Sequence, residues 1–155
     1  MFDVPTISAI VTAASVIAGV LFAVIQFRNL VQTRQTDLIM RLYSDFRTQL
    51  NAKWLKLMSA QFKGYEDFAE KYSVSELIEV GMFYEGLGVL ASRKLVDIKL
   101  IDQLFGTPVI MTWEKFKPVI EGLRKQLGAP SYGWHTEYLY NHLIELAPWS
   151  KRAPK

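Results

Sequence analysis

An uncharged segment near the N-terminus constrains this chain more than any other feature. The residues from Ile7 to Phe27, ISAIVTAASVIAGVLFAVIQF, include no Asp, Glu, Lys or Arg. As an α-helix these 21 residues measure about 31 Å, which matches the ~30 Å hydrocarbon core of a bilayer. The segment therefore predicts a transmembrane helix over residues 7–27, preceded by a short extracytoplasmic stretch of residues 1–6.

Two other structures produce a similar apolar segment. A cleaved signal peptide has a basic beginning, a shorter apolar core and small residues at its cleavage site. Here Asp3 precedes the segment and Arg28 directly follows Phe27, so the pattern fits a signal peptide poorly. A helix buried in the core of a soluble protein is the second alternative. We favour the transmembrane helix.

Basic residues on one side of the segment predict its orientation. No Lys or Arg precedes it, whereas four arginines follow: Arg28, Arg34, Arg41 and Arg47. Because cytoplasmic flanks carry the excess of basic residues, we expect a plasma (inner) membrane protein with its N-terminus outside. Everything from residue 28 onward would then lie in the cytoplasm.

Three small residues share one face of the predicted transmembrane helix. Ser15, Gly19 and Ala23 are spaced four apart, and such residues let a second helix approach closely within lipid. We expect contact with another membrane-protein subunit or with a second copy of this chain. Small residues are common in transmembrane helices, so a face that simply meets membrane lipid is the alternative.

The helix is expected to continue past the membrane as a basic, amphipathic stem over residues 28–63. No Gly or Pro occurs between Gly19 and Gly64, and apolar residues recur at gaps of three and four. We therefore predict one helix from about Thr6 to about Gln61.

The charges of the stem suggest two roles. Residues 28–63 hold seven basic and two acidic side chains, whereas residues 64–92 hold one basic and six acidic. The stem could bind anionic headgroups through Arg28, Arg34 and Arg41. Alternatively, it could pair with the acidic residues that follow it.

The chain beyond the stem predicts a bundle of short helices over residues 64–148. Ser73 and Glu76 have the spacing of a capping box before an apolar helix. Asp97 and Gly106 mark the start and the end of a short helix. Pro108, Pro118 and Gly128 mark the start, the kink and the end of the next helix. Pro130 and Pro148 lie at the two ends of the last helix. No stretch predicts a strand. The expected fold is all-α, with an N-terminal transmembrane helix that continues into a small cytoplasmic helical bundle.

Gly81, Glu85 and Gly88 share one face of the apolar helix that follows Ser73. Glycine inside a helix costs ~1 kcal/mol relative to alanine, so two glycines on one face need a reason. Close approach of a neighbouring helix is the usual one. Glu85 between them could bind a cation or a basic group of a partner, but we favour an ion pair with an Arg of the stem.

The chain carries no motif for catalysis or cofactor binding. It has no Gly-rich phosphate loop, no HExxH, no GxSxG and no cysteine. The two histidines, His135 and His142, lack the paired Glu-x-x-His motifs of a di-iron bundle. We therefore predict no catalytic, cofactor or metal residues. The basic stem has no stacking platform beside it, so nucleic acid is not an expected partner.

The tail of residues 149–155 combines one aromatic with several basic side chains. Trp149, Lys151 and Arg152 follow Pro148 closely. This composition is typical of an anchor at the membrane interface. It is equally typical of a segment that binds a partner, and both roles stay open.

A series of short motifs in the second half of the chain resembles a known family. The series starts at FYEGLGVL, residues 83–90, and continues with LVD at 95–97, LFG at 104–106, WE at 113–114, PVI at 118–120 and Arg124. In this order, behind one N-terminal span, it resembles the small prokaryotic membrane proteins called domain of unknown function 4760, over most of residues 5–146. The resemblance implies a single span, an all-α domain and a prokaryotic source. It brings no catalytic residues.

Together these features predict a single-pass membrane protein whose cytoplasmic helical domain binds other proteins. It would be an accessory or scaffold subunit of a membrane complex rather than an enzyme. The alternative is an enzyme or small-ligand sensor whose site lies inside the bundle, near Glu85 and His142.

Overall fold

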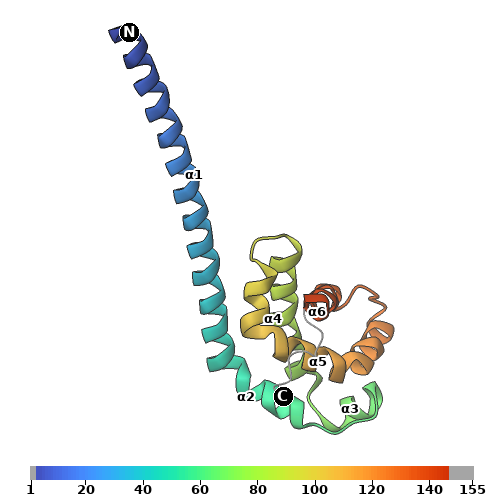
Figure 1. Ribbon diagram of the computed structural model, residues 1–155. Coiled ribbons are helices and arrows are strands. Elements are labelled where there is room, and N and C mark those ends of the chain that lie inside the picture. Colours follow the sequence, from blue (N-terminus) through green and yellow to red (C-terminus); the bar gives the residue numbers. More distant parts are fainter. Residues whose placement is uncertain (1–2, 147–155) are drawn as a thin grey trace, which may run out of the picture. The chain divides into compact units, whose positions relative to one another are not determined.

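The computed structural model describes residues 3–146, and the chain divides into two compact units, Met1–Leu38 and Ile39–Lys155. Helices joined by turns make up the described residues, with no strand among them, so the predicted all-α fold is confirmed (Figure 1). The boundary between the two units, after Leu38, falls within the stem predicted over residues 28–63.

The first unit consists of the N-terminal part of helix α1, which spans Val4–Asp45. Pro5 lies in the first turn, where its missing N–H leaves no hydrogen bond unmade. Apolar side chains project from every side of this part of the helix and are exposed. The most apolar 18 residues have a mean hydropathy of 2.4. Among the described residues, this is the one helix long and apolar enough to cross a membrane.

The helix predicted as one piece from Thr6 to Gln61 is interrupted by a π-helical turn. Residues Phe46–Leu50 form this turn, η1, and helix α2 follows over Asn51–Ser59. No Gly or Pro marks the site, so the cause lies in packing. The ring of Phe46 is buried, with its centroid 5.2 Å from that of Phe83 and 5.9 Å from that of Phe105.

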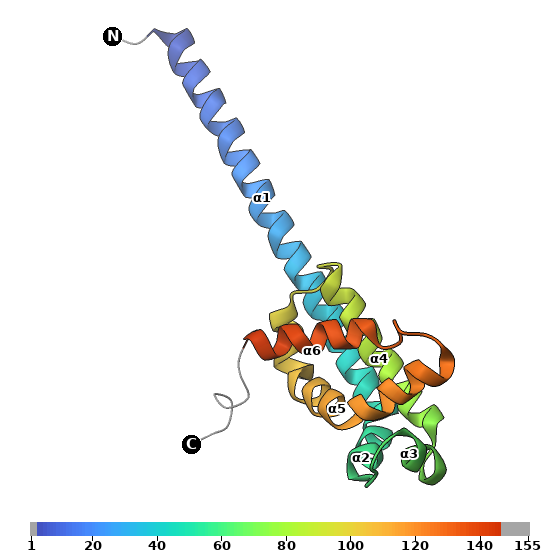
Figure 2. The same ribbon diagram turned by 90° about the vertical axis from the view of Figure 1, so that its right-hand side faces the viewer.

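Four further helices complete the second unit: α3 (Tyr65–Lys71), α4 (Val74–Ser92), α5 (Ile98–Leu127) and α6 (Trp134–Leu146). Figure 2 shows α6 lying across α4 and α5, and α4 packs on α6 more extensively than on any other helix. The core gathers large apolar side chains from every helix of this unit, with Ile39, Phe46, Leu57, Phe68, Val80, Leu87, Phe105, Phe116 and Leu139 among the most buried.

Helix α5 is longer than the sequence predicts. The short helix expected to end at Gly106 continues through Pro108 and Pro118 without a break. Buried residues on both sides of Pro108, including Phe105 and Val109, face the same core, so packing holds the segment helical despite the lost backbone donor.

The predicted ends of α5 are confirmed. The Asp97 side chain accepts a hydrogen bond from the backbone N–H of Lys99 at 2.9 Å. At the other end Gly128 adopts a left-handed conformation with φ of 60°, which an L side chain rarely adopts.

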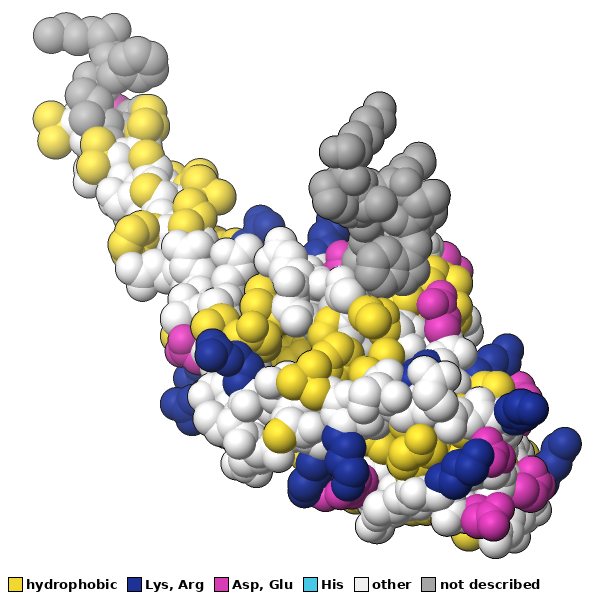
Figure 3. All heavy atoms as spheres, turned by 90° about the horizontal axis from the view of Figure 1, so that it is seen from below, with side chains coloured by type: hydrophobic (Ala, Val, Ile, Leu, Met, Phe, Trp, Pro, Cys, Tyr) yellow, Lys and Arg dark blue, Asp and Glu magenta, His cyan; other side chains and the backbone are white. Residues whose placement is uncertain are grey.

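The start of α4 differs from the predicted capping box. The Ser73 hydroxyl pairs with that of Ser75 instead of a backbone N–H. Glu76 instead accepts from Lys56 of α2 at 2.9 Å, and Glu79 pairs with Lys53 at 2.7 Å. Two basic residues of the predicted stem therefore do pair with the acidic helix. Acidic and basic side chains also alternate along the edge of the second unit in Figure 3.

Helix α3 was not predicted, and it packs against α5 at a glycine. A Cβ placed on Gly122 would lie 2.2 Å from the Cβ of Tyr65. Only glycine allows so close an approach of the two helices at this point. The last helix also differs from expectation, since α6 begins at Trp134 after a series of turns rather than at Pro130.

Candidate functional site

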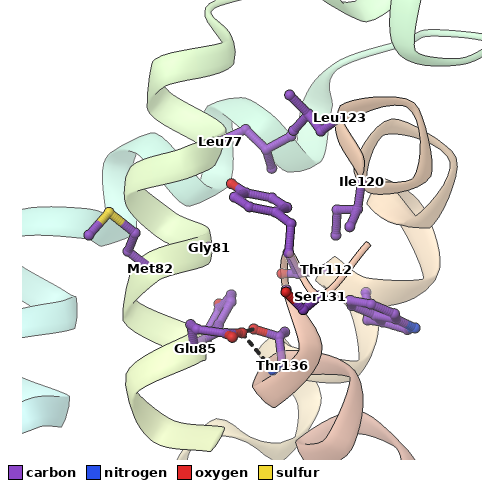
Figure 4. Close-up of a pocket in the computed structure, with 13 residues that line it drawn as sticks. Leu77, Gly81, Met82, Glu85, Thr112, Ile120, Leu123, Ser131 and Thr136 are labelled. Carbon is purple, nitrogen blue, oxygen red and sulfur yellow. Dashed lines mark hydrogen bonds between the residues drawn. The ribbon is translucent and has the colours of Figure 1, made fainter. Parts of the chain in front are cut away.

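A cavity of about 180 Å³ lies within the second unit, between α4, α5 and the segment that leads into α6. Leu77 and Leu123 approach one another at one end of it, and Glu85 and Thr136 lie at the other (Figure 4). Most of its wall is apolar. The lining residues are Leu77, Gly81, Met82, Tyr84, Glu85, Thr112, Trp113, Ile120, Leu123, Ser131, Tyr132, Gly133 and Thr136.

Glu85 of α4 caps the N-terminus of α6. Its carboxylate accepts hydrogen bonds from the backbone N–H of His135 at 3.1 Å and of Thr136 at 2.8 Å. The Thr136 hydroxyl donates a third, at 2.9 Å. The first N–H groups of a helix have no partner within the helix, and Gly133, just before α6, has no side chain to serve them. The expectation that Glu85 pairs with an Arg of the stem is therefore wrong.

The two glycines that flank Glu85 have different surroundings. A Cβ on Gly88 would lie 2.1 Å from the backbone oxygen of His135, so α6 approaches α4 here as closely as expected. A Cβ on Gly81 would meet nothing within 4 Å. Gly81 borders the cavity instead of a neighbouring helix, so the expectation of close packing does not hold there.

Tyr84 carries a buried polar group close to the cavity. The residue is fully buried, and its hydroxyl finds no hydrogen-bond partner among the described residues. Burial raises the pKa of the Tyr84 phenol, and the nearby Thr112 side chain lowers it by a smaller amount. Leaving a buried hydroxyl unpaired costs about 1–3 kcal/mol, so this group calls for an explanation.

The hydroxyl of Thr112 makes two hydrogen bonds. It accepts a hydrogen bond from the indole N–H of Trp54 at 2.8 Å and donates to the carbonyl of Pro108 at 2.7 Å. Its single proton is thus used within the protein, whereas one of its two acceptor lone pairs remains for the neighbouring Tyr84 side chain.

Arg124 fixes the segment that closes the cavity. Its Nε donates to the backbone oxygen of Tyr132 at 2.8 Å, and its Nη2 pairs with Glu137 at 2.7 Å. Tyr132 is thereby held against the cavity. Burial raises the pKa of its phenol, and the negative charge of Glu85 raises it further.

Several of the motif residues that suggested the family resemblance lie around this cavity. Tyr84, Glu85, Trp113 and Ile120 line it, and Arg124 holds its closing segment. Sequence reasoning found Glu85 but missed Tyr84, Thr112, Tyr132 and Thr136 as lining residues. A glycine directly before α6, in place of a capping residue, is a signal that a distant side chain must cap this helix.

The histidines do not meet in this site. His142 lies against Tyr138, with ring centroids 4.0 Å apart and Nδ1 2.9 Å from the Tyr138 carbonyl oxygen. His135 reaches the Ser92 hydroxyl at 3.5 Å. Within residues 3–146, no three acidic or histidine side chains are grouped as metal ligands.

The other predicted site residues are not among the residues that line the cavity. Ser15, Gly19 and Ala23 are exposed on α1, where the Ser15 hydroxyl donates to the Val11 carbonyl at 2.8 Å. A Cβ on Gly19 would meet nothing within 4 Å. The three arginines, Arg28, Arg34 and Arg41, are also exposed. Trp149, Lys151 and Arg152 lie outside the described residues.

Comparison with known proteins identifies a family. A family model described as a domain of unknown function (DUF4760) matches residues 9–143. No curated protein and no solved structure matches the chain. The matched range begins in the apolar helix α1, includes the residues that line the cavity and ends in α6. It covers most of the sequence, and the chain therefore belongs to the DUF4760 family.

Proposed function

We propose that this protein is a single-pass membrane protein whose helical domain binds other proteins, as an accessory or scaffold subunit of a membrane complex. The observation that carries the proposal is the exposed apolar surface of α1. From Ser8 to Phe27 its described side chains are exposed, and none of them carries a charge.

Lipid is the partner that best explains this surface. Soluble monomers rarely expose apolar patches larger than a few hundred Å². A helix that is apolar on every side is typical of a membrane span or of the core of a large protein. The chain's own core lies in the second unit, so residues 8–27 are not part of it. This supports membrane lipid as the surroundings of these residues.

The flanking charges support an N-terminus outside the cell membrane. Arg28 and Arg34 follow the apolar segment directly, and no basic residue precedes it. Under the positive-inside rule the second unit then lies in the cytoplasm. Ser15, Gly19 and Ala23 would offer a partner helix a surface for close approach within the bilayer.

The test uses the full chain with a reporter fused after Lys155. We expect the intact protein to stay in the membrane fraction after an alkaline carbonate wash, with the reporter active only in the cytoplasm. Mild-detergent purification should then recover stoichiometric protein partners. Loss of the first ~30 residues from the purified chain would show that the apolar segment is a cleaved signal peptide, and would contradict the proposal. A soluble intact chain, or a reporter active only outside the cytoplasm, would also contradict the proposal.

The cavity favours a second candidate function, that of a small-ligand sensor or enzyme in the cytoplasmic domain. Ligand sites are concave, mostly apolar and supplied with a few well-placed polar groups. The cavity of the second unit has this character, with the carboxylate of Glu85 in a mostly apolar wall. Protein that purifies as a monomer with a bound small molecule would favour this candidate over the first.

A further inference from the structure

We propose that α1 pairs in parallel with α1 of a second copy of this chain, along a polar seam that crosses the membrane. The seam consists of Ser8, Thr12, Ser15, Gly19 and Gln26. The proposal rests on the proposed transmembrane helix. It names a second copy as the partner and extends the contact surface beyond Ser15 and Gly19.

The spacing of the polar residues in the apolar segment defines the seam. Residues 8–27 include four polar side chains, those of Ser8, Thr12, Ser15 and Gln26. Together with Gly19 they follow one another at gaps of four, three, four and seven. A seven-residue repeat keeps its members on one side of a helix that supercoils left-handedly around a partner. All polar side chains of this segment therefore face the same way.

The surface of α1 has a shallow hollow at the Gln26 end of the seam. Its lining forms two overlapping groups at spacings i, i+3, i+4 and i+7: Ala23, Gln26, Phe27 and Leu30, and Gln26, Asn29, Leu30 and Thr33. In a coiled coil, four residues at these spacings form the hole that receives a side chain of the facing helix. All six residues are exposed in the single chain, so the hollow is open to a partner helix.

Gln26 is the seam residue that most needs a partner. Two seam hydroxyls donate within α1, that of Thr12 to the Ser8 carbonyl at 2.9 Å and that of Ser15 to the Val11 carbonyl at 2.8 Å. The amide of Gln26 makes no hydrogen bond with any described residue. Hydrocarbon offers an amide no partner, and glutamine side chains in membranes form hydrogen bonds across helices.

A second copy is the partner that matches this surface. An amide is both donor and acceptor, so two Gln26 side chains can satisfy one another across a two-fold axis, where the same surface of each copy is in contact. Both copies insert in the same direction, which makes the pair parallel. No seam residue is charged. Arg28 follows Gln26 by two residues, about 200° around the helix, so the arginines of the two copies stay apart.

Disulfide crosslinking tests the seam directly, because the chain has no cysteine of its own. Single cysteines are introduced into the full chain and oxidised with copper phenanthroline in native membranes. Ser15→Cys lies on the seam, and Ile17→Cys is the matched control, at nearly the same depth on the opposite side. A disulfide requires Cβ atoms about 4 Å apart, so we expect the covalent dimer to form on the order of tenfold faster in Ser15→Cys.

A second measurement tests the pairing of Gln26. Copies with donor or acceptor fluorophores fused after Lys155 are reconstituted into phosphatidylcholine vesicles, and energy transfer gives the dimerisation constant. Gln26→Leu should weaken dimerisation about fivefold, as the loss of an interhelical hydrogen bond of ~1 kcal/mol requires. Val24→Leu introduces the same side chain at an exposed position off the seam and should leave dimerisation unchanged.

Carbonate extraction of the same variants separates this proposal from the membrane anchor. A chain that resists extraction but forms no dimer, or that crosslinks from Ser15→Cys only to another protein, would overturn the second copy and leave the anchor intact. Equal crosslinking of Ser15→Cys and Ile17→Cys would reject the seam. An unchanged dimerisation constant in Gln26→Leu would show that the amide meets lipid headgroups, and would overturn the pairing. A chain released by carbonate would refute both the pairing and the anchor.

Discussion

The two units of this chain place apolar side chains in opposite environments. In the first unit Ile17 is 61% and Phe22 62% exposed, whereas Phe105 and Phe116 of the second unit are completely buried. Both units consist of helix. The difference is that apolar residues surround the first helix on every side, while those of the second unit face one another.

This contrast indicates that the two units are suited to different surroundings. A helix with an apolar stripe covers that stripe by packing on its neighbours, whereas a helix without a polar side needs an apolar medium around it. Substitutions of the same kind should therefore affect different properties in the two units. Each of the following predictions tests that separation.

The largest effect is expected from emptying the core of the second unit. The Phe105 ring lies 5.7 Å from the ring of Tyr43 and 5.5 Å from that of Phe83. Phe105→Ala leaves a cavity among these rings and should lower the free energy of unfolding by about 3–5 kcal/mol. Phe22→Ala is the matched control in the first unit and should leave unfolding unchanged. Denaturant titration by near-UV circular dichroism measures both, and equal losses would remove the contrast.

A charge in the apolar helix should affect membrane insertion. Leu21→Arg places a guanidinium near the middle of the proposed span and should disfavour insertion by about 2.5–3.5 kcal/mol. Leu55→Arg, on the exposed side of α2, should leave both insertion and stability nearly unchanged. Carbonate extraction of the two variants measures the effect. If Leu21→Arg stays in the membrane as fully as Leu55→Arg, residues 7–27 do not span it.

Two glycines offer the next comparison. In Gly88→Ala the new methyl group would lie 2.1 Å from the His135 backbone oxygen. Overpacking of this kind should lower the free energy of unfolding by about 1–3 kcal/mol. Thermal unfolding measures the loss, and an unchanged midpoint would mean that α6 moves away without cost.

Gly19→Leu should leave unfolding of the second unit unchanged, because a Cβ at this position meets nothing in the chain. It should instead weaken association with a membrane partner or a second copy, since the longer side chain separates the two backbones. Co-purification in mild detergent at equal membrane abundance measures this, with Leu21→Ile as the control. Full retention of partners would mean that the Ser15, Gly19 and Ala23 face meets lipid.

Removing the cap of α6 should have a moderate effect. Glu85→Ala takes away the acceptor for two backbone N–H groups and the Thr136 hydroxyl, and should cost about 1–2 kcal/mol of the free energy of unfolding. Glu79→Ala breaks an exposed pair with Lys53 and should cost less than about 1 kcal/mol. Urea titration of both variants makes the comparison, and equal costs would show that the cap contributes no more than a surface ion pair.

The smallest effect has the opposite sign. Tyr84→Phe removes a buried hydroxyl that has no partner in the described structure. It should raise the free energy of unfolding by about 1 kcal/mol, because the phenyl ring is buried without desolvating a polar group. Thermal unfolding of the ligand-free protein measures the gain. A loss of stability would show that the hydroxyl is paired within the protein.

Local signals made part of this fold predictable from the sequence. The uncharged stretch from Ile7 to Phe27, the cap at Asp97 and the terminating Gly128 each depend on residues near one another in the chain. Helix formation and capping are decided at that range. These features were expected and are present as helix α1 and as the ends of α5.

Features that depend on distant packing could not be predicted. The π-helical turn at Phe46 has no Gly or Pro to mark it, and the helix through Pro108 persists because buried neighbours hold it. The candidate site also depends on packing between distant parts of the chain. Glu85 was noticed as a carboxylate between two glycines, but its partners at His135 and Thr136 are 50 and 51 residues away.

The distance between Glu85 and its partners has a consequence for the order of folding. The first turn of α6 receives its acceptors from α4 only after the intervening chain has closed a loop of about 50 residues, and this closure costs conformational entropy that forming a single helix does not. We therefore expect the helices α4 and α5 to form early in folding, and α6 to gain its capped start late. In hydrogen-exchange experiments the amides of His135 and Thr136 should acquire protection after those in the middle of α5.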